Sequence, residues 1–469
     1  MEIFEYKRCA AGDPIPILCN AMDGDRRPYA GIFVCQRRTC VIQQSLNGVN
    51  MKKTSTAAVA VLSIITAVAA MQSAVAKTPA WLQGWTIKGF AAAYDWTSIN
   101  NQFSKVNQYT LTEGGGLFIG SPSYRGFSLA VEPIFQTGLG LHPSNPKNVS
   151  RTLGPSVAAL GQAYIQYRGY GFTVKGGDFI TTSSPWSSSS VGIRLLPITY
   201  QGVHVKFRAS RHLHLYASRV VRYRYVNESR YNAGTIYTTY LPGLAGRTSS
   251  GYMSAGLNYE RRIPRADELD TKDSVWAWDY YQYARLYLAQ TVDSAKLGPA
   301  TGIVGLQVMD AKKQSGYLGR VDAQVYGAEV GAAYRPFKLV LADDYLPAHP
   351  NAFNYGGLAT PYNTITDSGP MFSQPITDST EDFGSGSAYS VHLDYLGIPR
   401  LFTQIRFVDL HMRTTPVYSN FREVSLLVSY KLKAVKGLNI TNIANYATEY
   451  PNRNLPGFFQ NRIMLVYTF

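Results

Sequence analysis

Apolar and polar residues alternate with a period of two along most of the chain, from about residue 85 to the C-terminus. In 203–208 the odd positions are apolar and the even positions polar, whereas in 424–430 the apolar residues mostly occupy the even positions. Alternation of this kind predicts amphipathic β-strands. The runs are about ten residues long, which is the length that a tilted strand needs to cross a bilayer.

Seventeen such runs can be identified. They lie near 85–95, 109–120, 126–136, 158–168, 171–180, 199–209, 212–226, 250–260, 277–290, 300–310, 322–334, 337–345, 387–396, 400–411, 422–432, 437–447 and 461–469. A single-chain bacterial barrel has an even number of strands, so one more strand is expected. Segment 262–290 has room for it if Val275–Tyr281 forms a strand before Ala284–Gln290. The pattern therefore predicts an all-β protein, a transmembrane antiparallel β-barrel of 18 strands.

The connections between these runs differ in length on the two sides of the expected barrel. Short connections occur at 168–170, 335–336 and 397–399. Long connections rich in Ser, Pro, Asn and Gly occur at 137–156, 181–197, 227–249 and 346–386. Short periplasmic turns and long extracellular loops are typical of outer-membrane barrels.

Composition supports a membrane wall rather than a soluble core. Charged residues make up 16% of the chain, compared with about 25% in a typical soluble domain. Beyond residue 76 there is no apolar run of about 18 residues, so transmembrane helices are not expected there. In a barrel wall only alternate residues face lipid, which is consistent with both observations.

The N-terminal part has a different character. Met51 begins a basic Met-Lys-Lys segment, followed by an apolar stretch at 57–71 and Ala74-Val75-Ala76. This is the pattern of a secretory signal peptide, which predicts three parts: a signal peptide at 51–76, a mature barrel at 77–469, and residues 1–50 as a mis-assigned start that is absent from the mature protein. All four cysteines lie in this first part, at Cys9, Cys19, Cys35 and Cys40. Their spacing matches no common metal site, although two disulfides would be possible.

Charge and export together limit the partners. Residues 1–76 hold eight of the 45 basic and five of the 30 acidic residues, which leaves a net charge of +12 for 77–469. Since an exported protein meets no nucleic acid, this charge points to anionic lipopolysaccharide or to anionic solutes in a pore. The chain ends on Phe469 after an alternating strand. This ending resembles the signal read by the barrel-assembly machinery, so we expect that machinery as a partner.

One segment carries a family resemblance. Residues Gly192–Gly202 read G-I-R-L-L-P-I-T-Y-Q-G, which resembles the R-L-L-P-x-T-x-x-G segment of OprD-family porins. The segments 421–430, 436–440 and 461–467 resemble the last three strands of that family in order and spacing. The resemblance implies an 18-stranded barrel in the outer membrane, a pore narrowed by in-folded loops, substrates that bear a carboxylate, and a ladder of arginines on the lumen wall.

The penultimate strand departs from this family pattern. Where the family tends to have Arg-x-Arg, this chain has Thr441-Asn442-Ile443. One step of the arginine ladder is therefore absent, and the substrate preference of the family cannot simply be transferred.

Basic residues on the polar faces of the strands are the candidate pore lining. Parity with apolar neighbours predicts that seven of them face the lumen, and the resemblance alone adds Arg194. The set is Arg194, Lys175, Lys206, Arg208, Arg222, Arg224, Arg285 and Arg406. Guanidinium groups pair well with carboxylates, and a row of weak sites lets a solute pass without being trapped. The competing interpretation is that any water-filled lumen is polar and holds some cations.

The serine-rich connection 181–197 is the candidate constriction. Ser187, Ser188 and Ser189 could donate hydrogen bonds to a passing solute, or the segment could be an exposed flexible loop. These features predict a porin for passive, selective diffusion of small anionic compounds such as amino acids or organic acids. We expect a monomer or a loose homo-oligomer, without cofactor or metal.

Three other functions are less consistent with the sequence. An oligosaccharide porin of the chitooligosaccharide type is the closest alternative, but Trp81, Trp85, Trp96, Trp276 and Trp278 fit an interfacial aromatic girdle better than a sugar slide. An outer-membrane hydrolase is less favoured. His392 and Asp394 would share a strand face, but that spacing alone does not make a catalytic triad. A plugged transporter is disfavoured because the first strand follows residue 76 within ten residues.

Overall fold

The computed structural model describes residues 18–22, 28–32, 83–101, 106–189, 194–261, 269–363, 369–376, 378–412, 420–448 and 457–469. The predicted signal peptide, the expected mature start at Lys77 and most of residues 1–50 lie outside this set. The chain divides into two units, Met1–Ser63 and Ile64–Phe469. In the first unit, β1 (Leu18–Met22) and β2 (Pro28–Ile32) form a two-stranded antiparallel sheet.

The second unit is a closed barrel of 18 antiparallel strands, as the alternation predicted. The strands are β3 (Thr86–Ile99), β4 (Gln108–Gly120), β5 (Phe127–Thr137), β6 (Val157–Gly169), β7 (Phe172–Phe179), β8 (Thr199–Arg208), β9 (Leu213–Arg224), β10 (Tyr252–Arg261), β11 (Leu269–Tyr280), β12 (Ala284–Leu297), β13 (Ala300–Lys313), β14 (Val321–Tyr334), β15 (Phe337–Leu346), β16 (Gly386–Tyr395), β17 (Leu401–Met412), β18 (Phe421–Lys431), β19 (Leu438–Thr448) and β20 (Phe458–Thr468). The eighteenth strand is found where it was expected, because β11 and β12 separate at the turn 281–283.

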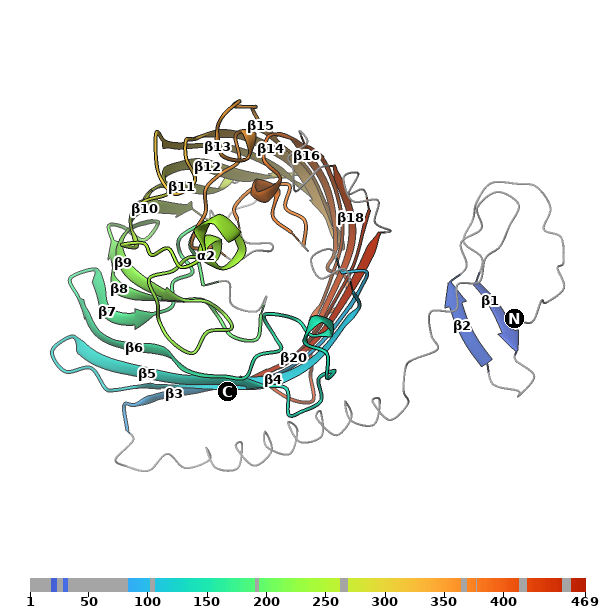
Figure 1. The fold of residues 1–469 in the computed structure, drawn as a ribbon, viewed down its shortest axis with the longest axis horizontal. Helices are drawn as coiled ribbons and strands as arrows, with labels where there is room; N and C mark the ends of the chain where they lie inside the picture. Colours follow the sequence, from blue (N-terminus) through green and yellow to red (C-terminus); the bar gives the residue numbers. More distant parts are fainter. Residues whose placement is uncertain are drawn as a thin grey trace. The chain divides into compact units, whose positions relative to one another are not determined.

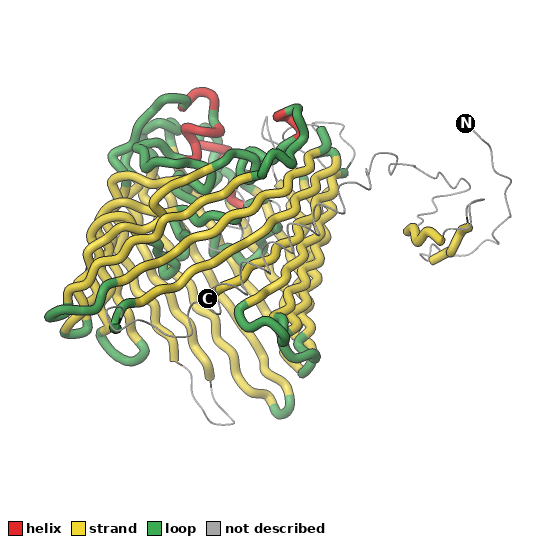
Figure 2. The backbone as a smooth tube through the Cα atoms, turned by 90° about the horizontal axis from the view of Figure 1, so that it is seen from below, coloured by secondary structure: helices red, strands yellow, loops and turns green. Residues whose placement is uncertain are grey.

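Each strand pairs with its neighbours in sequence, and β20 closes the ring on β3 (Figure 1). At this closure Phe459 lies opposite Ile99. Figure 2 shows the strands inclined across the barrel, with the larger loops gathered at one rim. The short helices of the described residues lie in connections: η2 (Pro146–Asn148), α2 (Ile236–Tyr240), η3 (Pro242–Leu244), η4 (Phe353–Tyr355) and η5 (Thr380–Phe383). Among the described residues no helix is long and apolar enough to cross a membrane.

The outer wall is apolar because successive side chains of a strand point to opposite faces. In β15, Leu339 and Leu341 are 43% and 45% exposed, whereas Val340 and Asp344, on the inner face, are 6% and 0% exposed. Such a wall, with large apolar side chains exposed outward on most strands, is the surface that a bilayer covers in membrane barrels.

Two belts of aromatic side chains border this apolar wall. At the short-turn end, neighbouring strands place Phe127 on Tyr167, Phe172 on Phe207 and Phe337 on Tyr395, with ring centroids 5.0, 4.4 and 5.4 Å apart. Towards the long-loop end, about half of the side-chain surface is exposed at Tyr287, Tyr326, Tyr345, Tyr389 and Tyr446. Aromatic girdles at both membrane interfaces are characteristic of such barrels.

The interior is filled on one side by loops. Apolar side chains on the inner faces of β10–β14 pack against residues of the connection 347–385, among them Leu358, Tyr362, Met371 and Phe383. In Figure 1 this connection and α2 lie inside the ring of strands. The long connections therefore shape the lumen as well as the rim.

Candidate functional site

A group of cations lines the inner wall formed by β7 and β8. Lys206 and Arg208 lie on the same face of β8 as the buried His204, opposite the outward Val203, which is 45% exposed. Lys175 of β7 is directly opposite His204 in the register. Lys175, Lys206 and Arg208 therefore share the inner wall, as parity predicted, and we call them the basic wall.

Aromatic and hydroxyl groups hold the basic wall in place. The Lys175 ammonium lies 4.6 Å from the ring centroid of Tyr164, and that of Lys206 lies 5.7 Å from the ring of Tyr216. Contacts of this kind attract a cation to the face of the ring. His204 Nδ1 makes a 2.9 Å hydrogen bond with the hydroxyl of Ser218 on the next strand. The cations are thus positioned by neighbouring strands and not only by their own.

Arg222 and Arg224 do not face the lumen, contrary to the parity argument. A β-bulge shifts the register from Gln201–Arg222 to Gly202–Val220 and leaves Val221 as an extra residue. Beyond the bulge Tyr223 points inward, so Arg222 lies exposed on the outer face. Gly202 permits the bulge, because its φ is +155° and an added Cβ would lie 2.0 Å from the carbonyl oxygen of Arg219.

Arg224 is fully buried and is used in structure. Its guanidinium donates to Thr199 Oγ1 at 3.2 Å and to three backbone carbonyls, those of Pro197, Tyr225 and Glu228, at 2.6, 3.1 and 3.1 Å. These bonds join the start of β8 to the connection that follows β9. Arg224 is therefore not available to a solute.

Arg285 also faces outward, again contrary to prediction. Its side chain is 66% exposed and forms a 3.6 Å ion pair with Asp279 of the neighbouring strand. The parity argument failed because Leu286 and Leu288, which were assigned to the lipid face, are 0% and 2% exposed on the inner face. Where loops fill the barrel, the inner face is apolar, so apolar residues no longer mark the outside.

Arg194 is placed on an aromatic residue rather than in the basic wall. It is 7% exposed, and its guanidinium carbon lies 5.3 Å from the centre of the Trp96 ring. Burial lowers the pKa of Arg194, which the nearby Tyr225 and Tyr94 partly oppose. Arg462 of β20 lies over the same ring at 4.8 Å. The predicted site did not include Arg462. The signal for it is its alternation with Ile463 on the last strand, which places Arg462 on the inner face.

The inner face carries a second set of polar groups that bind the connection 347–385, here called the inner loop. Asp344 Oδ2 accepts a hydrogen bond from Ser373 N at 2.6 Å, and Glu423 Oε1 accepts one from Ile376 N at 2.7 Å. Arg406 donates to the carbonyl of Gln374 at 2.7 Å. Arg406 faces inward as predicted, and in the structure it contacts this loop.

The family resemblance implied in-folded loops, but the sequence did not single out the inner loop as one of them. Its described residues are anchored from several strands, since Gln307 of β13 also donates to the carbonyl of Pro370 at 2.8 Å. Among the long connections, the serine-rich one was named as the candidate constriction. The only signal for the inner loop was its length, because loops of more than about 15 residues are usually functional or disordered.

The serine-rich connection 180–198, here called the serine loop, lies against the inner loop. Ser187 N donates to Asn363 Oδ1 at 2.5 Å, and its hydroxyl lies 2.9 Å from that of Tyr280. Ser189 Oγ accepts from Thr181 N, and Ser188 Oγ donates to the carbonyl of Thr181. Ser187 and Ser189 are 1% and 0% exposed. Their hydroxyls thus stabilise the loop and are not presented to a solute, contrary to expectation.

Three tryptophans assigned to the outer girdle are inside the barrel. Trp276 and Trp278 are 2% and 1% exposed and stack on each other at 5.6 Å, and Tyr216 stacks on Trp276 at 5.5 Å. Trp278 donates to Ser184 of the serine loop. Trp96 likewise faces inward, and Trp81 lies outside the described residues. The assignment failed because an apolar lumen face, again, resembles a lipid face in sequence.

No group of three or more His, Cys, Asp or Glu residues that could hold a metal ion occurs among the described residues. His392 of β16 lies directly opposite Arg406 in the register. On the outer face His411 contacts Asp409 at 3.1 Å and lies opposite Ser387. Within the described part of the chain, Ser387 and His411 make no hydrogen bond with each other, so this group does not have the geometry of a catalytic triad.

The chain matches no protein-family model and no curated protein. It does match solved structures. Pseudomonas aeruginosa OccK9 (OpdG) superimposes with a TM-score of 0.67 at 17% identity, covering 83% of this chain and 99% of that chain. A BenF-like porin from Pseudomonas fluorescens Pf-5 gives 0.65 at 17% identity, with 82% and 99% covered. P. aeruginosa OccK2 (OpdF) in complex with glucuronate gives 0.62 at 18%, with 82% and 98% covered. These matches confirm the predicted fold.

Proposed function

We propose that the chain is an outer-membrane porin of the OprD type, through which small carboxylate-bearing solutes diffuse passively. The observation that carries this proposal is the basic wall inside the barrel. The apolar outer wall, the two aromatic belts and the fold shared with solved porins support the location in the outer membrane.

Electrostatics explains how the basic wall would select anions. Lys206 and Arg208 are two residues apart on one strand, a separation of about 7 Å along the backbone. This is less than the Debye length of about 8 Å at physiological salt, so their fields add. Walls of low dielectric constant focus such a field into the lumen. A carboxylate would therefore be concentrated beside β7 and β8.

The inner loop and the serine loop would restrict the size of the solute. Both are held by specific hydrogen bonds inside the barrel, and they bury the aromatic row of Tyr216, Trp276 and Trp278. We therefore place the solute path on the side of the lumen that carries the basic wall. Two of the similar structures contain acids, glucuronate in OccK2 and vanillate in OpdK, which is consistent with a carboxylate substrate here.

Flux through liposomes tests this proposal. Residues 77–469, refolded into proteoliposomes, should admit glucuronate faster than glucose, because these two solutes have closely similar size and differ in charge. An equal rate for both, with open channels shown by conductance, would contradict carboxylate selectivity. The absence of any conductance or swelling by correctly folded barrels would contradict the porin itself.

The aromatic row favours a second candidate function, that of an oligosaccharide porin, because stacked aromatic rings bind the apolar faces of sugars. Chitooligosaccharide should leave the ionic current unchanged if the row stays covered by the serine loop. Block of the current by chitohexaose that is abolished in Trp278→Ala would favour the oligosaccharide porin instead.

We also propose that the barrel performs no chemistry. Assays on phospholipid and peptide should show no hydrolysis. Hydrolysis that is lost on changing His392 or His411 to Ala would establish an enzyme.

A further inference from the structure

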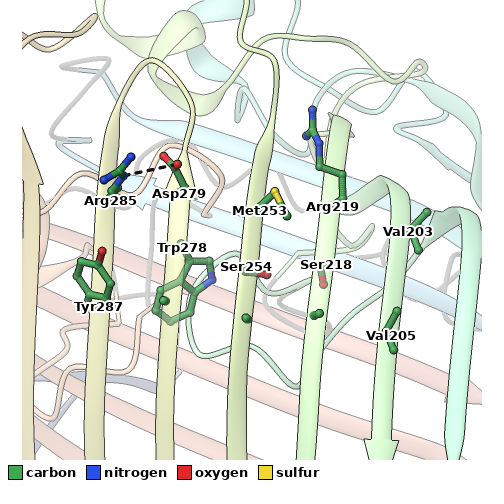
Figure 3. Close-up of a pocket in the computed structure, with 13 residues that line it drawn as sticks. Val203, Val205, Ser218, Arg219, Met253, Ser254, Trp278, Asp279, Arg285 and Tyr287 are labelled. Atoms are coloured by element: carbon green, nitrogen blue, oxygen red, sulfur yellow. Dashed lines mark ion pairs between the residues drawn. The ribbon is translucent and has the colours of Figure 1, made fainter.

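The outer wall of the barrel has a hollow that the porin function does not use. It has a volume of about 490 Å³ and lies over β8–β12 (Figure 3). At its floor, Ala217, Ala255 and Ala277 lie side by side on three neighbouring strands. Larger side chains border it, including Val203 and Tyr287. The hollow exists because small residues interrupt a wall of bulky ones.

A second hollow extends the first along the wall. It has a volume of about 450 Å³ and shares Ala255, Ala277 and Tyr287 with the first. It adds apolar side chains one register row further from the long-loop end, Leu215, Leu257 and Val275. Together the two hollows form an apolar groove that runs down the wall, which is the shape that an acyl chain fills.

Charged residues stand at the upper end of this groove. Arg219, Asp279 and Arg285 occupy one register row on β9, β11 and β12, directly above the alanines, and Lys312 of β13 continues the row. Figure 3 shows Asp279 and Arg285 beside the turn that joins their strands. The row lies above Tyr287, which belongs to the upper aromatic belt, so it is at the height of lipid headgroups.

The row has an excess of positive charge. Arg285 is paired with Asp279, and Lys312 with Asp310 at 3.3 Å. Arg219 is instead fixed by its 2.9 Å hydrogen bond to the Ser250 carbonyl and by stacking 4.9 Å over the Tyr281 ring. The exposed Arg222, three residues beyond Arg219 on β9, adds another cation. An anionic headgroup above an acyl chain would complement both parts of the site.

We propose that this groove binds a phosphorylated, acylated lipid of the outer leaflet, the lipid A part of lipopolysaccharide. One acyl chain occupies the alanine-floored groove, and a phosphate contacts Arg219 and Arg285. The inference rests on the proposed location in the outer membrane but not on the solute. It gives a role to Arg285 on the outer face, where the parity argument had not placed it.

Native mass spectrometry of detergent-solubilised barrel titrated with diphosphoryl lipid A tests the site. Two variants test the two parts of the site separately. Arg219→Gln with Arg285→Gln removes charge from the row, and Ala255→Phe fills the groove. Each arginine attracts the anionic headgroup of the lipid. We therefore expect the affinity for lipid A to fall roughly fivefold for each positive charge removed. Ala255→Phe should weaken lipid A with the charges intact. Arg211→Gln, an exposed cation on a short-end turn, serves as the matched control.

The same preparations are tested for conductance, so failure of the porin and failure of the lipid site are distinguishable. Lipid A bound equally by wild type and both variants would overturn the site. Equal binding of phosphatidylcholine and lipid A would show that the groove takes any acyl chain, which also overturns the proposal. Loss of lipid A in both variants, with conductance and the Arg211→Gln control unchanged, is the result that the structure predicts.

Discussion

At the scale of single residues, Arg224 is the side chain whose role differs most from its appearance in the sequence. Its guanidinium is buried with four hydrogen bonds, three of them to backbone carbonyls. Changing Arg224 to Gln leaves carbonyl oxygens buried without donors. We expect the free energy of unfolding to fall by about 2–4 kcal/mol, because buried polar groups that lose a charged hydrogen-bond partner destabilise the folded state.

The exposed Arg222, two residues away, is the matched control for this change. Arg222→Gln should leave stability in urea unchanged, and neither substitution should alter ion selectivity. A shift of selectivity in Arg224→Gln, without loss of stability, would return this residue to the lumen and contradict the buried network.

The cations of β7, β8 and β9 show what the alternation of polar and apolar residues can and cannot predict. Lys175, Lys206 and Arg208 were assigned correctly because β7 and β8 alternate without interruption below the bulge. Arg222 was not, since a single extra residue at Val221 reverses every side chain beyond it. A bulge leaves little trace in the pattern of polar and apolar residues.

At the scale of elements, the inner loop is held by two acidic residues that accept hydrogen bonds from its backbone. Asp344→Asn with Glu423→Gln should weaken these bonds, because each amide keeps one acceptor oxygen and replaces the other with an NH2 donor. The loop would then move more within the lumen. We expect a larger mean conductance and more frequent current fluctuations in single-channel recordings.

Asp343 provides the control, since it lies next to Asp344 in the chain but faces outward. Asp343→Asn should behave as wild type. If the double variant shows the same conductance and noise as Asp343→Asn, the inner loop does not shape the conducting path.

Strands could be predicted from the sequence, and loop positions could not. The period of two reports only that one face meets a different environment from the other, and this holds for every strand. It does not report which environment is apolar. The side chains of Leu286 and Trp278 face the part of the lumen that loops fill. In the sequence they cannot be distinguished from residues that face lipid. The contacts of the inner loop join residues far apart in the chain, such as Ser373 and Asp344, without any local motif.

At the scale of the whole molecule, the barrel begins at β3 and the signal-like segment precedes it. We expect signal cleavage after Ala76, so that the mature chain starts at Lys77 and contains no cysteine. N-terminal sequencing and the intact mass of the outer-membrane form would show this. A mature protein that retains Cys9 or Cys40 would contradict the assignment of residues 1–50.

The closed ring has two separate surfaces, a lumen that carries the basic wall and an outer wall that is largely apolar. Arg285 and Lys206 are both cations in strands of alternating pattern, but they face opposite surfaces. Only the inner one should affect permeation. Arg285→Gln is therefore the proper control for any change of charge in the lumen.

The reversal potential of the open channel across a salt gradient tests the central claim most directly. At about 10 mM salt, where the Debye length is about 30 Å, the wild-type pore should prefer anions. Changing Lys175, Lys206 and Arg208 together to Gln should move the selectivity towards neutral, whereas Arg285→Gln should not. The difference should shrink at about 1 M salt, where screening acts over about 3 Å. A wild-type pore that prefers cations, or a triple variant identical to wild type at low salt, would contradict the account.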